Sequence, residues 1–196
     1  MPNCSKDFEL ELQRVLSQSR TFDAALNTTH TPAAVLMPFV CMDGKWHLLF
    51  TKRADNVATH RGEISFPGGS FEPGDADIVS TALRETNEEI GVDGEHIRVL
   101  GVCDPLPTIS MFCVVPVIGV VDWPVTLKIN QDEVAKIILI PVEWLDTEGN
   151  WYEKDFEYEP GSFRRVIHYV DYQGDHLWGI TAMITRMVLE KVRDGS

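Results

Sequence analysis

The sequence predicts an α/β (α+β) protein in which helices flank a mixed β-sheet. Apolar, β-branched runs typical of strands are interleaved with segments of helical period. The two kinds of segment do not alternate strictly, so the sheet should contain parallel and antiparallel pairs. A chain of 196 residues, 44% of them hydrophobic, is long enough for one domain with a sizeable core.

Three amphipathic segments are expected to be helices. The first lies within residues 5–19, where apolar side chains recur at i, i+4, i+7 and i+8. The second begins near Asp75 or Asp77, either of which could cap it, and ends at Gly91, where a left-handed residue is expected. The third covers residues 180–192 near the end of the chain.

Strands are expected where β-branched and aromatic residues gather between turn residues. The clearest pair is 33–40 and 46–51, joined by a hairpin turn with Asp-Gly at its centre. The other strand segments are 64–66, 97–103, 112–121, 135–140 and 166–172. Residues 142–145 are expected to start a short helix, and the acidic, aromatic stretch 147–162 to form a surface loop.

Charge and cysteine content argue against several classes of protein. The net charge of −13 argues against a nucleic-acid partner, because phosphate binding depends on Lys and Arg. The chain has neither an apolar run that could span a bilayer nor a signal peptide, so we expect no membrane contact and a cytoplasmic location. The cysteines form no CxxC pair, so we expect neither a zinc site nor a disulfide framework. All four are therefore predicted to be reduced thiols: Cys4, Cys41, Cys103 and Cys113.

Three glutamates give the strongest indication of chemistry. Glu85, Glu88 and Glu89 lie at i, i+3 and i+4, which places them on one helix face with Cβ atoms about 5–6 Å apart. They would repel one another there unless a cation held them, and carboxylate oxygens suit Mg²⁺ or Mn²⁺. Gly68-Gly69 lets the backbone approach the same point. The pattern predicts a metal site for a phosphate ester or anhydride, against the alternative of a solvated acidic face.

At these residues the chain resembles the Nudix family. Residues 69–92 follow the Nudix box, G-x5-E-x7-R-E-U-x-E-E-x-G-U, where U is a bulky apolar residue, and RExxEExG is intact. Asp75 stands where the box has its first Glu, with eight residues instead of seven between it and Arg84. Thr86 replaces the usual apolar residue. Asp75 could equally serve only as a helix cap.

The segment that precedes the box narrows the resemblance to one subfamily. Residues 49–69 are similar to the signature LLTxRSxxLxxHxGxxxFPGG of coenzyme A pyrophosphatase-like Nudix proteins, with departures at Phe50, Ala54 and Val57. The box with one additional residue is also similar to that subfamily. The resemblance covers nearly the whole chain, from about residue 30 to 190.

The resemblance implies a Nudix-type α/β/α sandwich over residues 31–196, preceded by an N-terminal helix and connector in residues 1–30. It implies hydrolysis of a small nucleotide substrate, a nucleoside diphosphate linked to another moiety. For this subfamily the substrate would be coenzyme A, giving 4′-phosphopantetheine and adenosine 3′,5′-bisphosphate. ADP-ribose, NADH or nucleoside triphosphates stay open as substrates. A non-catalytic nucleotide sensor is the alternative of another class, and loops outside the box could form a homodimer interface.

Candidate roles follow from the needs of pyrophosphate hydrolysis, which are neutralised charge and an aimed, deprotonated water. The candidate ligands of Mg²⁺ or Mn²⁺ are Glu85, Glu88, Glu89 and the Gly69 carbonyl. The general base would be Glu88 or Glu89, and Glu133, in a loop before a strand, is a third candidate. Arg84 would orient a metal-binding Glu through a charge-assisted pair.

Three residues just before the glycine turn could meet the substrate phosphates: Arg53, His60 and Arg61. Two of the assignments have plain structural alternatives. His60 could be a surface histidine and Glu133 a solvated loop carboxylate.

Overall fold

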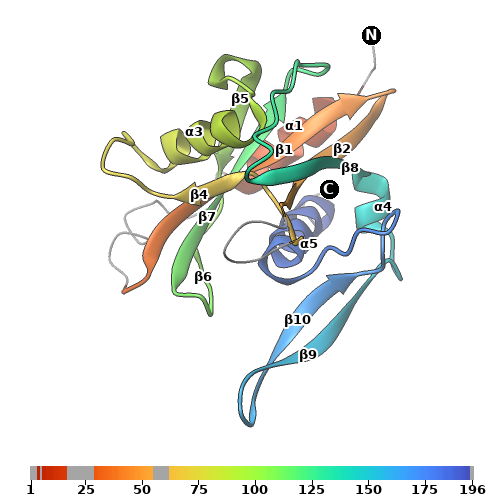
Figure 1. The fold of residues 1–196 in the computed structure, drawn as a ribbon. Coiled ribbons are helices and arrows are strands. Elements are labelled where there is room, and N and C mark those ends of the chain that lie inside the picture. Colours follow the sequence, from red (N-terminus) through yellow and green to blue (C-terminus); the bar gives the residue numbers. More distant parts are fainter. Residues whose placement is uncertain (1–3, 5, 17–28, 55–61, 195–196) are drawn as a thin grey trace.

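A computed structural model describes residues 4, 6–16, 29–54 and 62–194 (Figure 1). The helices are α1 Lys6–Leu16, α3 Ile78–Ile90, α4 Val142–Asp146 and α5 Gly179–Asp194, with a 3₁₀ turn, η1, at Gly94–His96. The strands are β1 Thr31–Met42, β2 Lys45–Arg53, β3 Ile64–Ser65, β4 Gly68–Ser70, β5 Ile97–Val102, β6 Leu106–Pro107, β7 Phe112–Val121, β8 Val134–Pro141, β9 Trp151–Glu159 and β10 Ser162–Tyr169. No helix of the described residues is both long and apolar enough to cross a membrane.

The central sheet is mixed, as predicted. Its main path is β3-β2-β1-β7-β5, and β4, β6 and β8 pair with β1, β7 and β2 respectively. β1 and β7 run parallel, whereas the other pairings among the described strands of this sheet are antiparallel. The predicted hairpin turn joins β1 to β2 through Asp43 and Gly44, both with positive φ.

Helices cover both faces of this sheet, which gives the expected α/β/α sandwich (Figure 1). Alternation along β1 divides the core in two. Leu36 and Val40 face the side that holds α3, whereas Met37 and Phe39 face the side that holds α1 and α5. The predicted division between residues 30 and 31 into connector and domain stays a prediction.

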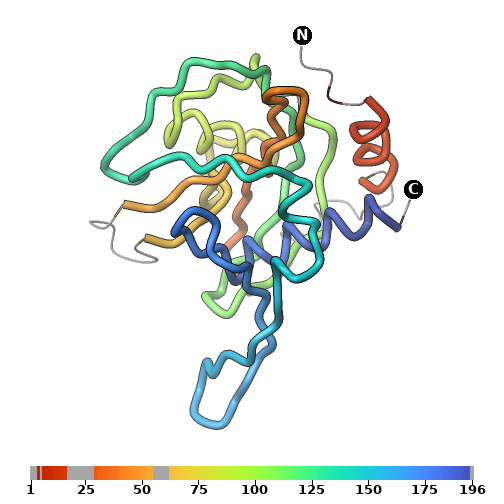
Figure 2. The backbone as a smooth tube through the Cα atoms, turned by 90° about the vertical axis from the view of Figure 1, so that its right-hand side faces the viewer, coloured from red at the N-terminus to blue at the C-terminus, as the bar shows by residue number. Residues whose placement is uncertain are grey.

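The expected surface loop at 147–162 is wrong. Most of it is β9, which pairs with β10 in a two-stranded hairpin that projects from the body (Figure 2). Nearly every residue of β9 is exposed. The segment alternates acidic with aromatic or basic side chains, a strand period without the apolar face that usually reveals a strand.

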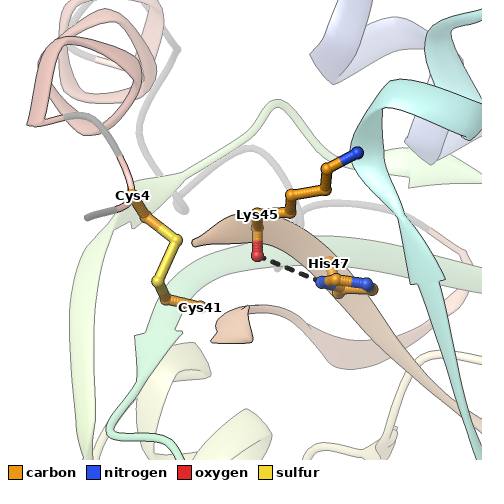
Figure 3. The surroundings of a disulfide bond; sticks show 4 residues. All are labelled: Cys4, Cys41, Lys45 and His47. Carbon is orange, nitrogen blue, oxygen red and sulfur yellow. Dashed lines mark hydrogen bonds between the residues drawn. A yellow bond between two sulfur atoms is a disulfide. The ribbon is translucent and has the colours of Figure 1, made fainter. Parts of the chain in front are cut away.

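The expectation of four reduced thiols is also wrong. Cys4 and Cys41 form a disulfide that ties the segment before α1 to the end of β1 (Figure 3). The two residues are 37 positions apart, and their approach to a Cα–Cα distance of 6.0 Å is a tertiary property that their spacing does not reveal. Cys103 and Cys113 are free, as predicted, and both are buried.

Reduction of this disulfide is expected to destabilise the protein. A cross-link over 37 residues restricts the unfolded chain, which corresponds to about 2–4 kcal/mol. Urea unfolding with and without a phosphine reductant measures the difference. The Cys41→Ser variant should match the reduced parent and be insensitive to reductant. Equal midpoints for oxidised and reduced parent would contradict the expectation.

Candidate active site

Helix α3 presents the three glutamates because both of its ends are capped. The Asp77 carboxylate accepts a hydrogen bond from the Ser80 N–H at 2.7 Å, so Asp77, not Asp75, is the N-cap. Gly91 closes the helix with φ 71°, and its N–H donates to the Asn87 carbonyl. These two caps fix the helix over Ile78–Ile90, and within it Glu85, Glu88 and Glu89 share one face.

Arg84 connects the parts of the site. Its guanidinium donates to Glu85 Oε1 at 2.8 Å and to Glu88 Oε2 at 3.1 Å. It also donates to the Ser70 carbonyl at 3.0 Å, just after the glycine turn. These bonds fix the helix face against β4 and orient two of the three glutamates.

Asp75 is the partner that holds Arg84 in this position. The guanidinium donates to both Asp75 oxygens, at 2.9 and 3.0 Å, in a bidentate pair. Asp75 also accepts from the Glu72 N–H and the Thr81 hydroxyl. These hydrogen bonds, the one from Arg84 first, hold the Asp75 pKa well below its usual range. The shorter acid therefore reaches Arg84 despite the additional residue in the box.

Thr86, the second departure from the box, is accommodated by local bonding. Its side chain is fully buried, and its hydroxyl donates to the Ala82 carbonyl at 2.7 Å, one turn earlier. The hydroxyl therefore has its hydrogen-bond partner within the helix, so Thr86 can be buried although it is polar.

Glu89 is the most unusual carboxylate of the site. The residue is only 3% exposed, and its Oε2 atom has no hydrogen-bond partner among the described residues. Burial raises the Glu89 pKa to about 8, and the nearby Glu85 and Glu133 carboxylates add to the rise. Arg53 and a hydrogen bond from the Gly68 N–H act in the opposite direction. The buried carboxyl has an unpartnered oxygen that a cation could bind, because the cation's charge would compensate the cost of ionising the group.

The two glycines bring the backbone against this cluster. A Cβ on Gly69 would lie 2.7 Å from Glu85 Oε2, so the carboxylate occupies the place of a side chain. A Cβ on Gly68 would meet the β1 backbone at Val35, and φ at Gly68 is 159°. Only glycines allow β4 to lie this close to both β1 and the Glu85 carboxylate.

Arg53 at the end of β2 and Glu133 in the turn before β8 reach the same place. The Ala54 N–H donates to the Glu133 carbonyl at 2.8 Å, where the end of β2 meets the start of β8. The Glu133 carboxylate is near enough to help raise the pKa of Glu85, whose rise is caused mainly by burial. We call Glu85, Glu88, Glu89 and Glu133 the carboxylate cluster.

Asn130 is a residue of the site that sequence reasoning missed. Its side-chain amide donates to Glu133 Oε1 at 3.0 Å, and its backbone N–H donates to the Glu89 carbonyl at 2.9 Å. The only available signal was an Asn three positions before a Glu in a turn. Two of the predicted substrate contacts, His60 and Arg61, lie outside the described residues.

The donor set of the carboxylate cluster suits a hard divalent cation. Two observations support the fit: Glu89 carries an unpartnered buried oxygen, and the Glu85 carboxylate fills the space beside Gly69. Within the described part of the chain, no three acidic, His or Cys side chains are gathered closely enough to hold an ion as they stand. Arg84 instead neutralises Glu85 and Glu88, so ion binding requires these side chains to reorient.

A cavity of about 530 Å³ lies elsewhere, beyond the end of α3. It is lined by Gly91, Asp93, Trp123 and Lys128 among others, and by no member of the carboxylate cluster. It is therefore separate from the arrangement described above.

Comparison with known proteins places the chain in a family. Residues 30–160 match the NUDIX domain. The chain is 34% identical over 188 residues to the uncharacterized Nudix hydrolase NudL of Yersinia pestis (strain Pestoides F), covering 94% of this chain and 91% of that protein. NudL of Yersinia pseudotuberculosis serotype O:1b (strain IP 31758) matches to the same extent.

A solved structure supports the fold. The MutT/nudix family protein of Enterococcus faecalis is similar with a TM-score of 0.55 at 16% identity, over 97% of this chain and 75% of that one. Since the NUDIX match covers more than half of the chain and the relatives span nearly all of it, the chain belongs to the Nudix family and is a Nudix hydrolase.

Proposed function

We propose that the protein is a metal-dependent diphosphatase of coenzyme A or its derivatives, releasing 4′-phosphopantetheine and adenosine 3′,5′-bisphosphate. The observation that carries the reaction class is the unpartnered, buried Oε2 of Glu89 within the carboxylate cluster. The choice of coenzyme A rests on the resemblance of residues 49–69 to the coenzyme A pyrophosphatase-like signature.

Glu85, Glu88, Glu89 and the Gly69 carbonyl would hold the cation, Mg²⁺ or Mn²⁺, which Nudix enzymes generally use. When bound, such a cation neutralises charge on the anhydride oxygens and makes water more acidic. Arg84 orients Glu85 and Glu88 from its place on Asp75. The proton acceptor is Glu88, Glu89 or Glu133, and the first two lie on the helix face that carries the cation site. Arg53, His60 and Arg61 are assigned to the substrate phosphates.

The direct test incubates the protein with coenzyme A and either Mg²⁺ or Mn²⁺ and follows the release of adenosine 3′,5′-bisphosphate. A panel of ADP-ribose, NADH and nucleoside triphosphates gives comparative kcat/KM values. Faster hydrolysis of a panel member than of coenzyme A would reassign the substrate. Absence of any turnover, with nucleotide binding retained, would favour the sensor function. A homodimer and a cytoplasmic location stay predictions.

Substitution of Gly69 is expected to impair catalysis selectively. In Gly69→Ala the added methyl group displaces the Glu85 carboxylate, and changes of this kind beside a metal ligand typically cost about 10–100-fold. Gly74→Ala is the matched control, because nothing lies within 4 Å of its added Cβ. The measurement is kcat/KM for both variants, and equal values would contradict the assigned role of the Gly69 turn.

A further inference from the structure

Outside the carboxylate cluster, two lysines stand directly opposite each other on neighbouring strands. Lys52 of β2 pairs with Lys136 of β8 in the antiparallel register. Like charges directly opposite each other repel, so this pairing requires another group that compensates the two positive charges. Both side chains are partly exposed, Lys52 by 31% and Lys136 by 49%. We call these two residues the lysine pair.

Asp175 holds both ammonium groups. Its carboxylate, only 5% exposed, accepts from Lys52 Nζ at 3.0 Å through one oxygen and from Lys136 Nζ at 2.7 Å through the other. Asp175 itself is fixed in a turn by reciprocal backbone bonds with Tyr172. Its carboxylate would need only one lysine as counter-ion. The second lysine leaves a net positive charge on a chain whose net charge is −13.

The lysine pair therefore retains capacity for an anion. Each ammonium group has three N–H donors, and Asp175 engages one of them on each lysine. The remaining donors start from positions that Asp175 has already fixed, so little conformational entropy is lost when they bind a phosphate. Two lysines that share one buried acid are thus prepared to hold a phosphate dianion.

The lysine pair is close in sequence to two predicted site residues, one on β2 and one in the turn before β8. Arg53, which is near Glu89, directly follows Lys52. Lys136 is three residues from Glu133, about 10 Å along the chain. Neighbouring residues of a strand face opposite sides, so Lys52 lies on the other face of β2 from Arg53. A substrate held by the carboxylate cluster would extend around the end of β2 to place a second phosphate group on the lysine pair.

The loop that carries Asp175 leads to a stack of aromatic and imidazole rings. Trp178, three residues later, stacks on His168 with ring centroids 5.6 Å apart, and His168 stacks on Tyr152 at 5.5 Å. Alternation along β9 puts Lys154 on the same side of the hairpin as Tyr152 and sends Glu153 to the other. The stack begins at Trp178, close to Asp175 along the chain, and its rings favour a nucleotide over an inorganic anion.

We propose that Lys52 and Lys136, positioned by Asp175, bind the ribose phosphate monoester of the substrate and so distinguish coenzyme A from 3′-dephospho-coenzyme A. This inference rests on the proposed function, since only a substrate with a phosphate beyond the scissile anhydride can use the lysine pair.

The test compares kcat/KM for coenzyme A and 3′-dephospho-coenzyme A in parent and variants. Lys136→Met should lower the ratio of the two values about tenfold, or about 1.4 kcal/mol, and adding Lys52→Met should lower it further. Lys136→Met leaves Asp175 paired with Lys52, so the fold should be retained, which circular dichroism checks. Lys45→Met is the control: Lys45 is exposed, pairs with Glu143 at the other end of β2, and should leave the ratio unchanged. An unchanged ratio in Lys136→Met would overturn the inference.

A binding measurement separates this inference from the proposed function. Calorimetry without metal compares adenosine 3′,5′-bisphosphate with adenosine 5′-monophosphate. The parent should bind the bisphosphate about tenfold or more tightly, and Lys136→Met should lose this preference. If the parent hydrolyses neither form of coenzyme A, the proposed function fails while the calorimetry still tests the lysine pair. Equal preference in parent and Lys136→Met would refute the phosphate site even if coenzyme A is the substrate.

Discussion

Replacing Glu89 by Gln should lower turnover by about 10²–10⁴-fold and, in the absence of divalent metal, stabilise the protein at pH 8. The loss of turnover follows because an amide is a poor cation ligand and cannot accept the proton from water. The gain in stability follows from the buried carboxyl, whose pKa is raised to about 8 in the folded protein.

The sign of the stability change depends on proton binding. Between the unfolded pKa near 4.3 and the folded pKa of about 8, folded Glu89 keeps a proton that the unfolded chain has released. The free energy of unfolding of the parent therefore falls as pH rises through this window, and Gln removes this contribution. At pH 8 we expect Glu89→Gln to exceed the parent by at least about 1 kcal/mol in urea unfolding with EDTA.

Two comparisons make this prediction specific. Glu95→Gln alters an 81% exposed carboxylate beyond α3 and should change neither turnover nor stability. Glu88→Gln should lower turnover by orders of magnitude as well. Unchanged rates in both Glu88→Gln and Glu89→Gln would refute a catalytic metal site. A stability difference between Glu89→Gln and parent that is the same at pH 5 and pH 8 would contradict the assigned titration.

Removal of the Asp75 carboxylate should damage both stability and catalysis. Asp75→Ala leaves Arg84, which is 24% exposed, without its bidentate partner, and we expect a loss of about 2–4 kcal/mol. Turnover of the folded variant should fall about 10–100-fold, because Arg84 no longer sets the direction of Glu85 and Glu88. Urea unfolding and kcat/KM at pH 7 measure the two effects.

The pH dependence gives this second prediction a further check. Arg84 holds the folded pKa of Asp75 below its unfolded value near 3.9, so the stabilisation is complete above that pH and is lost as pH falls below about 4. The difference in the free energy of unfolding between the parent and Asp75→Ala should therefore become smaller as pH falls below about 4. Asp77→Ala, the matched control, removes the helix cap and should cost about 1 kcal/mol without altering kcat/KM. Equal kinetic losses in both variants would mean that Asp75 only supports the helix.

Local patterns carried much of the fold prediction. The i, i+3, i+4 spacing of the glutamates, the Gly91 stop and the Asp-Gly turn each depend on neighbours within a few residues, and the structure has all three. The projecting hairpin was missed because β9 is exposed on both faces and lacks an apolar side. The Cys4–Cys41 disulfide was missed because two distant segments must meet before it can form.

The sequence by itself determined the mixed α/β class and the helix face that carries the glutamates, because these follow from short-range spacing and hydrophobic period. The family and the sandwich architecture were implied by the resemblance of its motifs. Only the tertiary structure decided how the departures are accommodated. Asp75 reaches Arg84 although the box is one residue longer, and Glu133 and Asn130 join the helix from a distant loop. Burial of Glu89 and the shared contact of Lys52 and Lys136 with Asp175 likewise arise only when strands, helix and loop pack together, because desolvation and ion pairing depend on three-dimensional surroundings.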